Sequence, residues 1–181
     1  MNRIVRDDLV RNTESILDFV QAQINSDLGE TRMILGSYAQ TIRAMILHGE
    51  GAVKLQIYTD EMSAYMQSSE NSKLNINGLY GYIENFSDGP VFLNGIGMDP
   101  PSDYEPRNRP WYKGAIAAGS GVFETRPYDD FVTGAVIITD SCCIYDDKGG
   151  YLGVVCIDIR IGYIGEKAVN TALTKDGYGF L

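Results

Sequence analysis

The sequence predicts an α+β fold in which one long N-terminal helix leads into an antiparallel sheet. Apolar residues between Val5 and Ile46 recur at gaps of three, four and seven positions with no proline among them. This spacing favours a single amphipathic helix over residues 3 to about 48. After Asn71 the chain changes to short apolar runs, rich in β-branched and aromatic residues and separated by turn residues. Helix first and sheet second is typical of an α+β domain.

The N-terminal helix is expected to be longer than the domain that follows it. A helix rises ~1.5 Å per residue, so residues 3 to 48 would span roughly 65 to 70 Å. We therefore expect its first half to stand away from the domain or to pack on a partner. The pair His48-Gly49 is a stop signal, and a second helix is predicted for residues 52–69.

Five strands are predicted, and the best-marked connections between them are two tight turns. Residues 87–90 (Ser-Asp-Gly-Pro) carry a turn signal, and residues 146–150 have the composition of a hairpin loop. Short helices are expected on one side of the sheet, which gives a PAS-like layout. The strands are expected at residues 79–86, 91–97, 121–127, 135–145 and 151–161, and the short helices at residues 111–118 and 164–173.

Composition limits the classes of partner. The chain has 181 residues, enough for one domain with or without an extension, and 44% of them are hydrophobic. A formal net charge of −9 argues against nucleic acid or anionic lipid as the main partner. No run approaches the ~18 apolar residues of a membrane-spanning helix, and no signal-peptide pattern opens the chain. Any membrane segment is therefore expected outside these residues.

Metal and histidine chemistry have little support in the sequence. Cys142, Cys143 and Cys156 are odd in number and lack a CxxC spacing or a histidine cluster. Cys143 and Cys156 would have marginal disulfide geometry. His48, the only histidine, lies near a helix end, where a cap is more typical than a catalyst. We expect no metal, no cofactor and no histidine-based triad.

One short segment, DYEPRNRPWYKGA at residues 103–115, combines cationic and aromatic side chains. Its prolines fix φ, so the side chains are presented in set directions. Arg109 offers a planar donor fork that suits a carboxylate, and Trp111 adds one N–H group and a flat wall. Tyr104 and Tyr112 contribute hydroxyls. The segment can therefore bind an anion beside an apolar group.

Acidic side chains in later segments complement this cationic one. Tyr128 and Asp130 alternate, so on a strand they would face the same way. Asp158 lies amid apolar residues and needs a cationic partner if it is buried. The hairpin register sets Thr139 roughly opposite Asp158, which makes one sheet face as polar as the floor of a small-ligand pocket. These groups are complementary to a zwitterion, with Arg109 binding its carboxylate and the two aspartates its ammonium.

Each candidate residue also has a purely structural interpretation. Arg109 could pair with a neighbouring acid such as Glu105, and Trp111 and Tyr112 could belong to the core. Asp158 could pair with an arginine without any ligand. The joint spacing of these residues favours a binding site over these separate interpretations.

Other functions stay open at this point. The pair Asp129-Asp130 leaves a carboxylate hydrolase to be considered, but adjacent strand residues point to opposite faces and no nucleophile signature lies nearby. An oligomerisation module built on the long helix is a second alternative. An amine sensor is a third, and Arg109 argues against it, because an unpaired buried guanidinium is destabilising. Arg107 is interpreted as structural or solvent-facing.

Three segments resemble the double-Cache sensor family: YEPRNRPWYKGA, ETRPYDDFVTGAVIITDS and KGGYLGVVCIDIRI. These are extracytoplasmic sensor domains of bacterial and archaeal chemoreceptors, histidine kinases and cyclic-dinucleotide enzymes. The resemblance covers nearly the whole chain. It implies a signalling helix at residues 1–50 and a membrane-distal PAS-like ligand-binding module at residues 51–165. Residues 166–181 would form a connecting helix and the start of a truncated membrane-proximal module.

The resemblance extends to the amino-acid-sensing subset of the family. In that subset the Arg and Trp positions hold the ligand carboxylate, and the Tyr and Asp positions hold the α-ammonium. Two departures are Asp129, where an apolar residue is common, and Cys156, where a small residue is common. The matching positions, and thus the implied ligand-binding residues, are Tyr104, Arg109, Trp111, Tyr112, Tyr128, Asp130 and Asp158.

The resemblance therefore implies a non-catalytic sensor module of a transmembrane signal-transduction receptor. It would recognise a free amino acid on the periplasmic or extracellular side, with biogenic amines or another small organic ligand in the same pocket as the alternative. Membrane anchoring would come from segments absent from this sequence, and no nucleic acid is involved. The long helix allows a homodimer.

Overall fold

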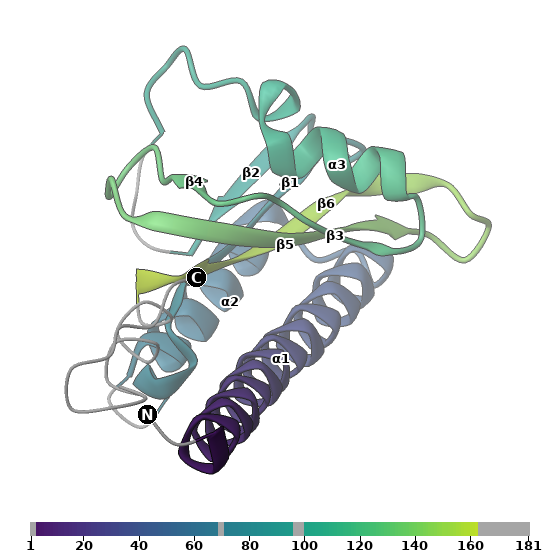
Figure 1. Ribbon diagram of the computed structural model, residues 1–181. Helices are drawn as coiled ribbons and strands as arrows, with labels where there is room; N and C mark the ends of the chain where they lie inside the picture. The colour runs from purple at the N-terminus through teal and green to yellow at the C-terminus, as the bar shows by residue number, and fades with distance from the viewer. Residues whose placement is uncertain (1–2, 69–70, 96–99, 163–181) are drawn as a thin grey trace.

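An antiparallel sheet separates two long helices from a shorter one in the computed structural model, which describes residues 3–68, 71–95 and 100–162 (Figure 1). The helices are α1 (Arg3–Leu47), α2 (Ala52–Gln67) and α3 (Pro110–Ala118), with short 3-10 turns η1 (Ser72–Leu74) and η2 (Pro106–Asn108). The strands are β1 (Ile76–Ile83), β2 (Val91–Asn94), β3 (Val122–Glu124), β4 (Tyr128–Asp129), β5 (Val136–Tyr145) and β6 (Tyr151–Arg160).

The long N-terminal helix is confirmed as one element of 45 residues. The first buried side chain in its described part is Thr31, and the side chains described between residues 18 and 30 are exposed or half-buried. Figure 1 shows the purple N-terminal end of α1 reaching well beyond the sheet. Among the side chains that the structure describes, burial of α1 therefore begins in its second half.

The sheet has the order β2-β1-β6-β5-β3, and β4 pairs with β5 beside this path. All pairings are antiparallel. The predicted hairpin register is confirmed, because Thr139 pairs with Asp158 and Ser141 with Cys156. Five strands were expected. The sixth, β4, has only two residues, too few to leave an alternating pattern in the sequence.

Of the short helices predicted on one side of the sheet, the described residues contain α3. α1 and α2 cover one face, whereas α3 lies on the other (Figure 1). Sequence periodicity identifies the apolar stripe of a helix but not the sheet face that the stripe covers. The helix predicted at residues 164–173 and the connecting segment at 166–181 lie outside the described residues.

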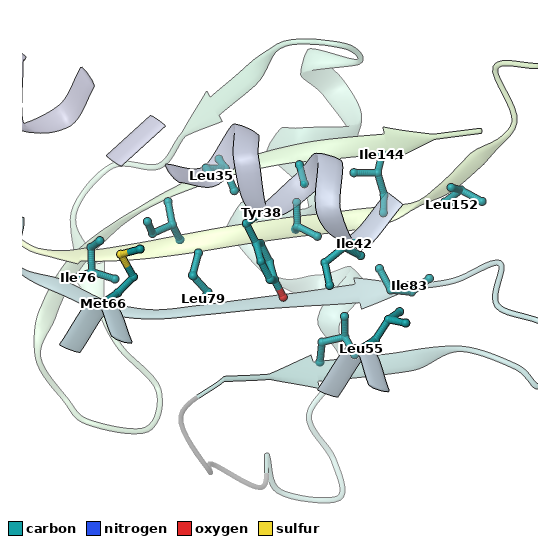
Figure 2. Close-up of a cluster of buried hydrophobic side chains, with 14 residues drawn as sticks. Leu35, Tyr38, Ile42, Leu55, Met66, Ile76, Leu79, Ile83, Ile144 and Leu152 are labelled. Carbon is teal, nitrogen blue, oxygen red and sulfur yellow. The ribbon is translucent and has the colours of Figure 1, made fainter. Parts of the chain in front are cut away.

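The main hydrophobic core lies between the sheet and the two N-terminal helices (Figure 2). Leu35, Tyr38 and Ile42 of α1 are fully buried against strand residues such as Leu79. The Tyr38 hydroxyl lies 2.8 Å from Thr59 Oγ1, and Thr59 in turn donates to the carbonyl of Leu55. Since the single hydroxyl proton of Thr59 is committed, Tyr38 is the donor, and this buried polar pair is satisfied.

Two arginines fasten α1 along β5. Arg32 Nε donates to Asp140 at 3.2 Å, and its guanidinium also binds Glu124 of β3 at 2.6 Å. Eleven residues further on, Arg43 donates to the carbonyl of Tyr145 at 2.7 Å and pairs with Asp147. The helix is thus held to the sheet by charge at both ends of its apolar contact.

None of the helices in the described part of the chain combines the length and apolarity that a bilayer crossing requires. α1 is long enough by length alone, but charged and polar side chains recur along it.

The close approach of β6 to β1 depends on Gly153. A Cβ atom at this position would lie 2.4 Å from the carbonyl oxygen of Tyr82 and 2.7 Å from Cα of Ile83, both backbone atoms. We expect Gly153→Ala to destabilise the domain by about 2 kcal/mol or more, because the strands would have to separate. Chemical denaturation of the variant measures this loss. Gly121→Ala is the control, since its Cβ would meet only an ordinary contact at 3.5 Å, and an equal loss in both variants would contradict the expectation.

Candidate functional site

A cavity of about 40 Å³ lies on the sheet face that carries α3. Its floor comes from β1, β2 and β6, and its walls come from the loop before α3 and the turn after β4. Six of the seven predicted site residues line it: Tyr104, Arg109, Trp111, Tyr128, Asp130 and Asp158. The remaining lining residues are Tyr80, Phe92, Asn94, Pro100, Phe131 and Val132.

Asp158 forms the acidic floor of the cavity. Its side chain is almost completely buried, with the residue 4% exposed. Tyr80 donates to its Oδ1 at 3.0 Å, and Thr139 donates to the same oxygen at 2.6 Å. Among the described residues no hydrogen bond reaches Oδ2, so one oxygen of this carboxylate stays available.

A chain of hydroxyl groups ends on this carboxylate. The Tyr128 hydroxyl lies 2.6 Å from Thr139 Oγ1. Thr139 has one hydroxyl proton and gives it to Asp158, so Tyr128 must donate to Thr139. Both tyrosine hydroxyls, Tyr80 and Tyr128, therefore point their protons toward the acidic floor and keep oxygen lone pairs free to accept from a third group.

Burial, with a smaller contribution from the nearby Asp130 carboxylate, raises the pKa of Asp158 to about 7. The main cause is the loss of water around the charged form. The hydrogen bonds from Thr139 and Tyr80 and the charge of Arg109 act in the opposite direction. Burial and the Asp158 charge also raise the pKa values of the Tyr80 and Tyr128 hydroxyls, which keeps both protonated donors.

Asp130 lines the cavity but is not a strand residue, contrary to the expected alternation with Tyr128. β4 ends at Asp129, and Asp130 opens a turn in which its carboxylate accepts from the backbone N–H and hydroxyl of Thr133. Asn77 also donates to it, at 3.3 Å. Gly134 closes the turn with φ of 67°, a conformation that glycine adopts at little cost. Much of the hydrogen-bonding capacity of Asp130 is therefore used by the turn.

Arg109 supplies the positive charge of the cavity. It lies at the junction of η2 and α3, and its guanidinium carbon is 5.4 Å from the ring centroids of both Tyr104 and Phe131. Two aromatic faces stabilise a cation in this position. Its Nε is buried and has no hydrogen-bond partner in the described structure. A buried donor without a partner is destabilising unless a bound group completes it.

Trp111 follows Arg109 by two residues and is 1% exposed. Its ring meets Tyr80 edge to face, with centroids 5.4 Å apart. Proline at the first position of α3 favours the start of the helix at this point, one residue before the predicted start. The start of the helix thus places an aromatic side chain in the cavity lining, against Tyr80 of the sheet.

Tyr112 does not line the cavity, although it was predicted as a site residue. Consecutive helix residues differ by about 100° in direction, so Tyr112 cannot face the same way as Trp111. Its hydroxyl donates to Glu84 at 2.8 Å and accepts from Tyr151 at 3.1 Å. It therefore belongs to a separate polar cluster at the end of β1.

The sequence prediction missed several lining residues, of which Tyr80 matters most because it contacts Asp158 directly. Tyr80 of β1 pairs with Cys156 of β6, and Asp158 lies two residues further along β6 on the same face. The alternation of Tyr80 and Tyr82 is a signal for that face, but Tyr80 and Asp158 are 78 positions apart, and the sequence does not reveal that β1 pairs with β6. Phe131 carries no pattern of its own.

The three cysteines are free thiols. Burial raises the pKa of Cys156, which lies two residues before Asp158 in β6 and on the same face of the sheet. Asp129, the other departure noted in the sequence, is exposed and outside the cavity lining. Within the described ranges no group of three or more His, Cys, Asp or Glu side chains could hold a metal ion.

The layered fold and the charged cavity on one sheet face define a ligand-sensing domain of the PAS-like type. The family described as "Methyl-accepting chemotaxis protein-like, first PDC sensor domain" matches residues 39–166. The chain belongs to this family. The resemblance to receptor sensor domains noted in the sequence is thereby confirmed.

Relatives agree in both sequence and structure. The methyl-accepting chemotaxis protein McpB of Bacillus subtilis is 24% identical over 174 residues, which are 96% of this chain and 24% of McpB. The chain thus spans about a quarter of that receptor's length. The L-serine complex of the CtaA ligand-binding domain from Pseudomonas fluorescens has a TM-score of 0.66 at 20% identity, covering 91% of this chain and 65% of that one. The domain of PctC from Pseudomonas aeruginosa in complex with GABA has a TM-score of 0.64 at 22% identity, covering 87% and 63%.

The raised pKa of Asp158 predicts that its ionised carboxylate lowers the stability of the ligand-free domain. An aspartate in an unfolded chain has a pKa of ~3.9, so the folded state binds this proton more tightly. The stability from Asp158 is therefore full below pH 4 and is lost as pH rises through about 7. We expect Asp158→Asn to raise the Tm of the ligand-free domain, and to raise it more at pH 8 than at pH 5. Differential scanning calorimetry at the two pH values checks this.

Asp129→Asn is the matched control, since this acid is adjacent to the cavity wall but exposed. It should leave Tm unchanged within a degree or two. A lower Tm for Asp158→Asn at pH 8 would show that the ionised carboxylate stabilises the fold, contrary to the expectation.

Proposed function

We propose that this chain is the extracytoplasmic sensor module of a transmembrane chemotaxis receptor and that it binds a free amino acid by both its carboxylate and its ammonium. The proposal depends on one observation: two oppositely charged side chains with unused hydrogen-bonding capacity line the same cavity. Arg109 has a buried Nε without a partner, and Asp158 has an oxygen without a donor. In the described structure the two side chains form no ion pair with each other.

The two charges suit the two ends of an amino acid. Arg109 presents a donor fork toward the cavity, which matches a carboxylate. Asp158 Oδ2 and the hydroxyl oxygen of Tyr128 can accept from an ammonium, since the tyrosine proton is directed to Thr139. A zwitterion therefore satisfies both unused groups at once, whereas a plain carboxylate or a plain amine would leave one of them buried without a partner.

The relatives support the same ligand class. The two solved domains described above were crystallised with L-serine and with GABA, each of which carries one carboxylate and one ammonium. The apolar and aromatic walls of this cavity, including Phe92, Phe131 and Val132, provide room for a side chain between or beside these charges.

The module acts by binding rather than by catalysis. Its only histidine, His48, lies just past the end of α1, on the far side of the sheet from the cavity. The acid with a raised pKa, Asp158, faces hydroxyl groups that are themselves held protonated. This arrangement binds and neutralises a cation, and it offers no activated nucleophile.

Trp111 is the only tryptophan and lines the cavity, so its fluorescence reports ligand binding. We expect at least one of the twenty amino acids to change its emission and to raise Tm by roughly 5 to 10 °C at about 100 times Kd, since binding then adds about 2.7 kcal/mol. The amine formed by decarboxylation of that amino acid should bind far more weakly. Fluorescence titration and thermal shift over the paired panel measure both effects.

Arg109→Met should remove the response to amino acids and leave the weak response to amines unchanged. Arg126→Met, which removes an exposed arginine outside the cavity, is the control. Equal affinity for an amino acid and its amine would overturn the carboxylate role of Arg109 and favour an amine sensor.

The outer face of α1 suits a second copy of the chain in the membrane-anchored receptor. Exposed residues, small or apolar with the exception of Gln40, recur there at gaps of three and four, as in a coiled coil. A Cβ atom at Gly29 or Gly36 would meet no atom within 4 Å. The exposed residues on this face are Ala22, Ser26, Gly29, Met33, Gly36, Gln40, Ala44 and Leu47.

A pair of matched cysteine variants tests this dimer. Met33 on α1 is 75% exposed and Val53 on α2 is 73% exposed, so the two sites are equally accessible. We expect Met33→Cys to form a disulfide-linked dimer under mild oxidation and Val53→Cys to stay monomeric, as judged on a non-reducing gel. Equal cross-linking of the two variants would count against the α1 interface.

A further inference from the structure

Glu84 lies outside the cavity, directly after β1, and binds two elements at once. Its Oε1 accepts from Arg107 of η2 and from the hydroxyl of Tyr112 of α3, the latter at 2.8 Å. Its backbone N–H donates to the carbonyl of Leu152 at 2.9 Å, which ties it to β6. The residue is therefore fixed to the sheet by its backbone and to the loop and helix above by its side chain.

The two partners of Glu84 flank Arg109 in the sequence. Arg107 precedes it by two residues in η2, and Tyr112 follows it by three residues in α3. Between them, the Arg109 N–H donates to the carbonyl of Pro106 at 3.0 Å, and its carbonyl accepts from Lys113 at 3.1 Å. The backbone that carries Arg109 is thus held on both sides by one carboxylate.

Arg109 has no ion pair of its own to set its position in the described part of the chain. Its guanidinium contacts the rings of Tyr104 and Phe131, which favour a cation near their faces without fixing the direction of its N–H groups. The direction of the donor fork therefore depends on the backbone between η2 and α3.

We propose that Glu84 is a positioning residue for recognition of the ligand carboxylate: by holding η2 and α3 to the end of β1, it orients the Arg109 guanidinium in the cavity. This inference rests on the proposed carboxylate role of Arg109. It assigns Tyr112, which does not reach the cavity, and Arg107 to the support of the site.

The contacts around Glu84 are those of a built cluster rather than of an isolated surface pair. The residue is only partly exposed, and Tyr151 donates to the hydroxyl of Tyr112 at 3.1 Å, so the cluster continues onto β6. The Arg107 guanidinium also lies 5.7 Å from the centroid of the Tyr82 ring. Although partial burial opposes it, the hydrogen bonds from Arg107 and Tyr112 hold the pKa of Glu84 below its usual value.

Two measurements on Glu84→Gln test the proposal. Glutamine keeps the size and one acceptor oxygen but loses the charge that binds both donors. In the ligand-free domain, we expect amide hydrogen exchange to rise across residues 104–114 and to stay unchanged across β5 and β6. In titrations of the twenty amino acids and their decarboxylated amines, we expect amino-acid affinity to fall about three- to tenfold, with amine affinity unchanged within about twofold.

Matched variants separate positioning from general loss of charge or stability. Asp88→Asn removes the same charge from an exposed turn four residues away and should change neither measurement. Tyr112→Phe keeps the ring packing, loses one hydrogen bond to Glu84, and should show the same pattern as Glu84→Gln at smaller size.

Each outcome has a defined meaning. Unchanged exchange across residues 104–114 overturns the proposal, and so does an equal loss of affinity for amino acids and amines, which would mark Glu84 as merely structural. If the unsubstituted domain binds no member of the panel, the proposed function is wrong, and so is the role of Glu84 in recognition of the ligand carboxylate. The exchange experiment then still decides whether Glu84 orders the loop around Arg109.

Discussion

The two-residue period of β5 and β6 is the constraint on which the rest of the structure depends. On one face of these strands, Val155 and Ile157 pack beneath α1 and α2 in the main core. On the other face, Asp158 lines the cavity, and Thr139 donates a hydrogen bond to it. Because successive side chains of a strand point to opposite faces, a slip of one residue would exchange the two sets and destroy both core and cavity together. The antiparallel register therefore determines both which residues face the hydrophobic core and which face the cavity.

The cavity is made from groups that a stability-optimised fold would avoid. A buried carboxylate with a raised pKa and a buried guanidinium nitrogen without a partner both weaken the empty domain. The surrounding structure tolerates them because Tyr80 and Thr139 satisfy one oxygen of Asp158, and two aromatic rings flank Arg109. Both side chains line the cavity. The two side chains that lower the stability of the empty domain are thus the same two that can bind a ligand.

Much of this arrangement follows from sequence patterns, and the exceptions have physical reasons. The long helix and the pairing of Thr139 with Asp158 follow from periodicity and one tight turn, which are local properties. The turn at Asp130 depends on a left-handed glycine and on a donor from a distant strand, Asn77. The contact of Tyr80 with Asp158 depends on the pairing of β1 with β6, which joins residues 78 positions apart in the chain. Such features arise only when segments far apart in the chain meet.

Thr139 and Asp140 are consecutive residues of β5 whose side chains contact different parts of the molecule on opposite faces of the sheet. Thr139 joins the hydroxyl chain at the cavity floor, and Asp140, on the reverse face, holds Arg32 where α1 leaves the sheet. A strand hydrogen-bonded on both sides is stiff, so these neighbouring Cα atoms move together. The same short piece of backbone therefore positions a hydroxyl beside Asp158 and a carboxylate beside Arg32. Any displacement of β5 at these residues would alter both the cavity and the attachment of the 45-residue helix.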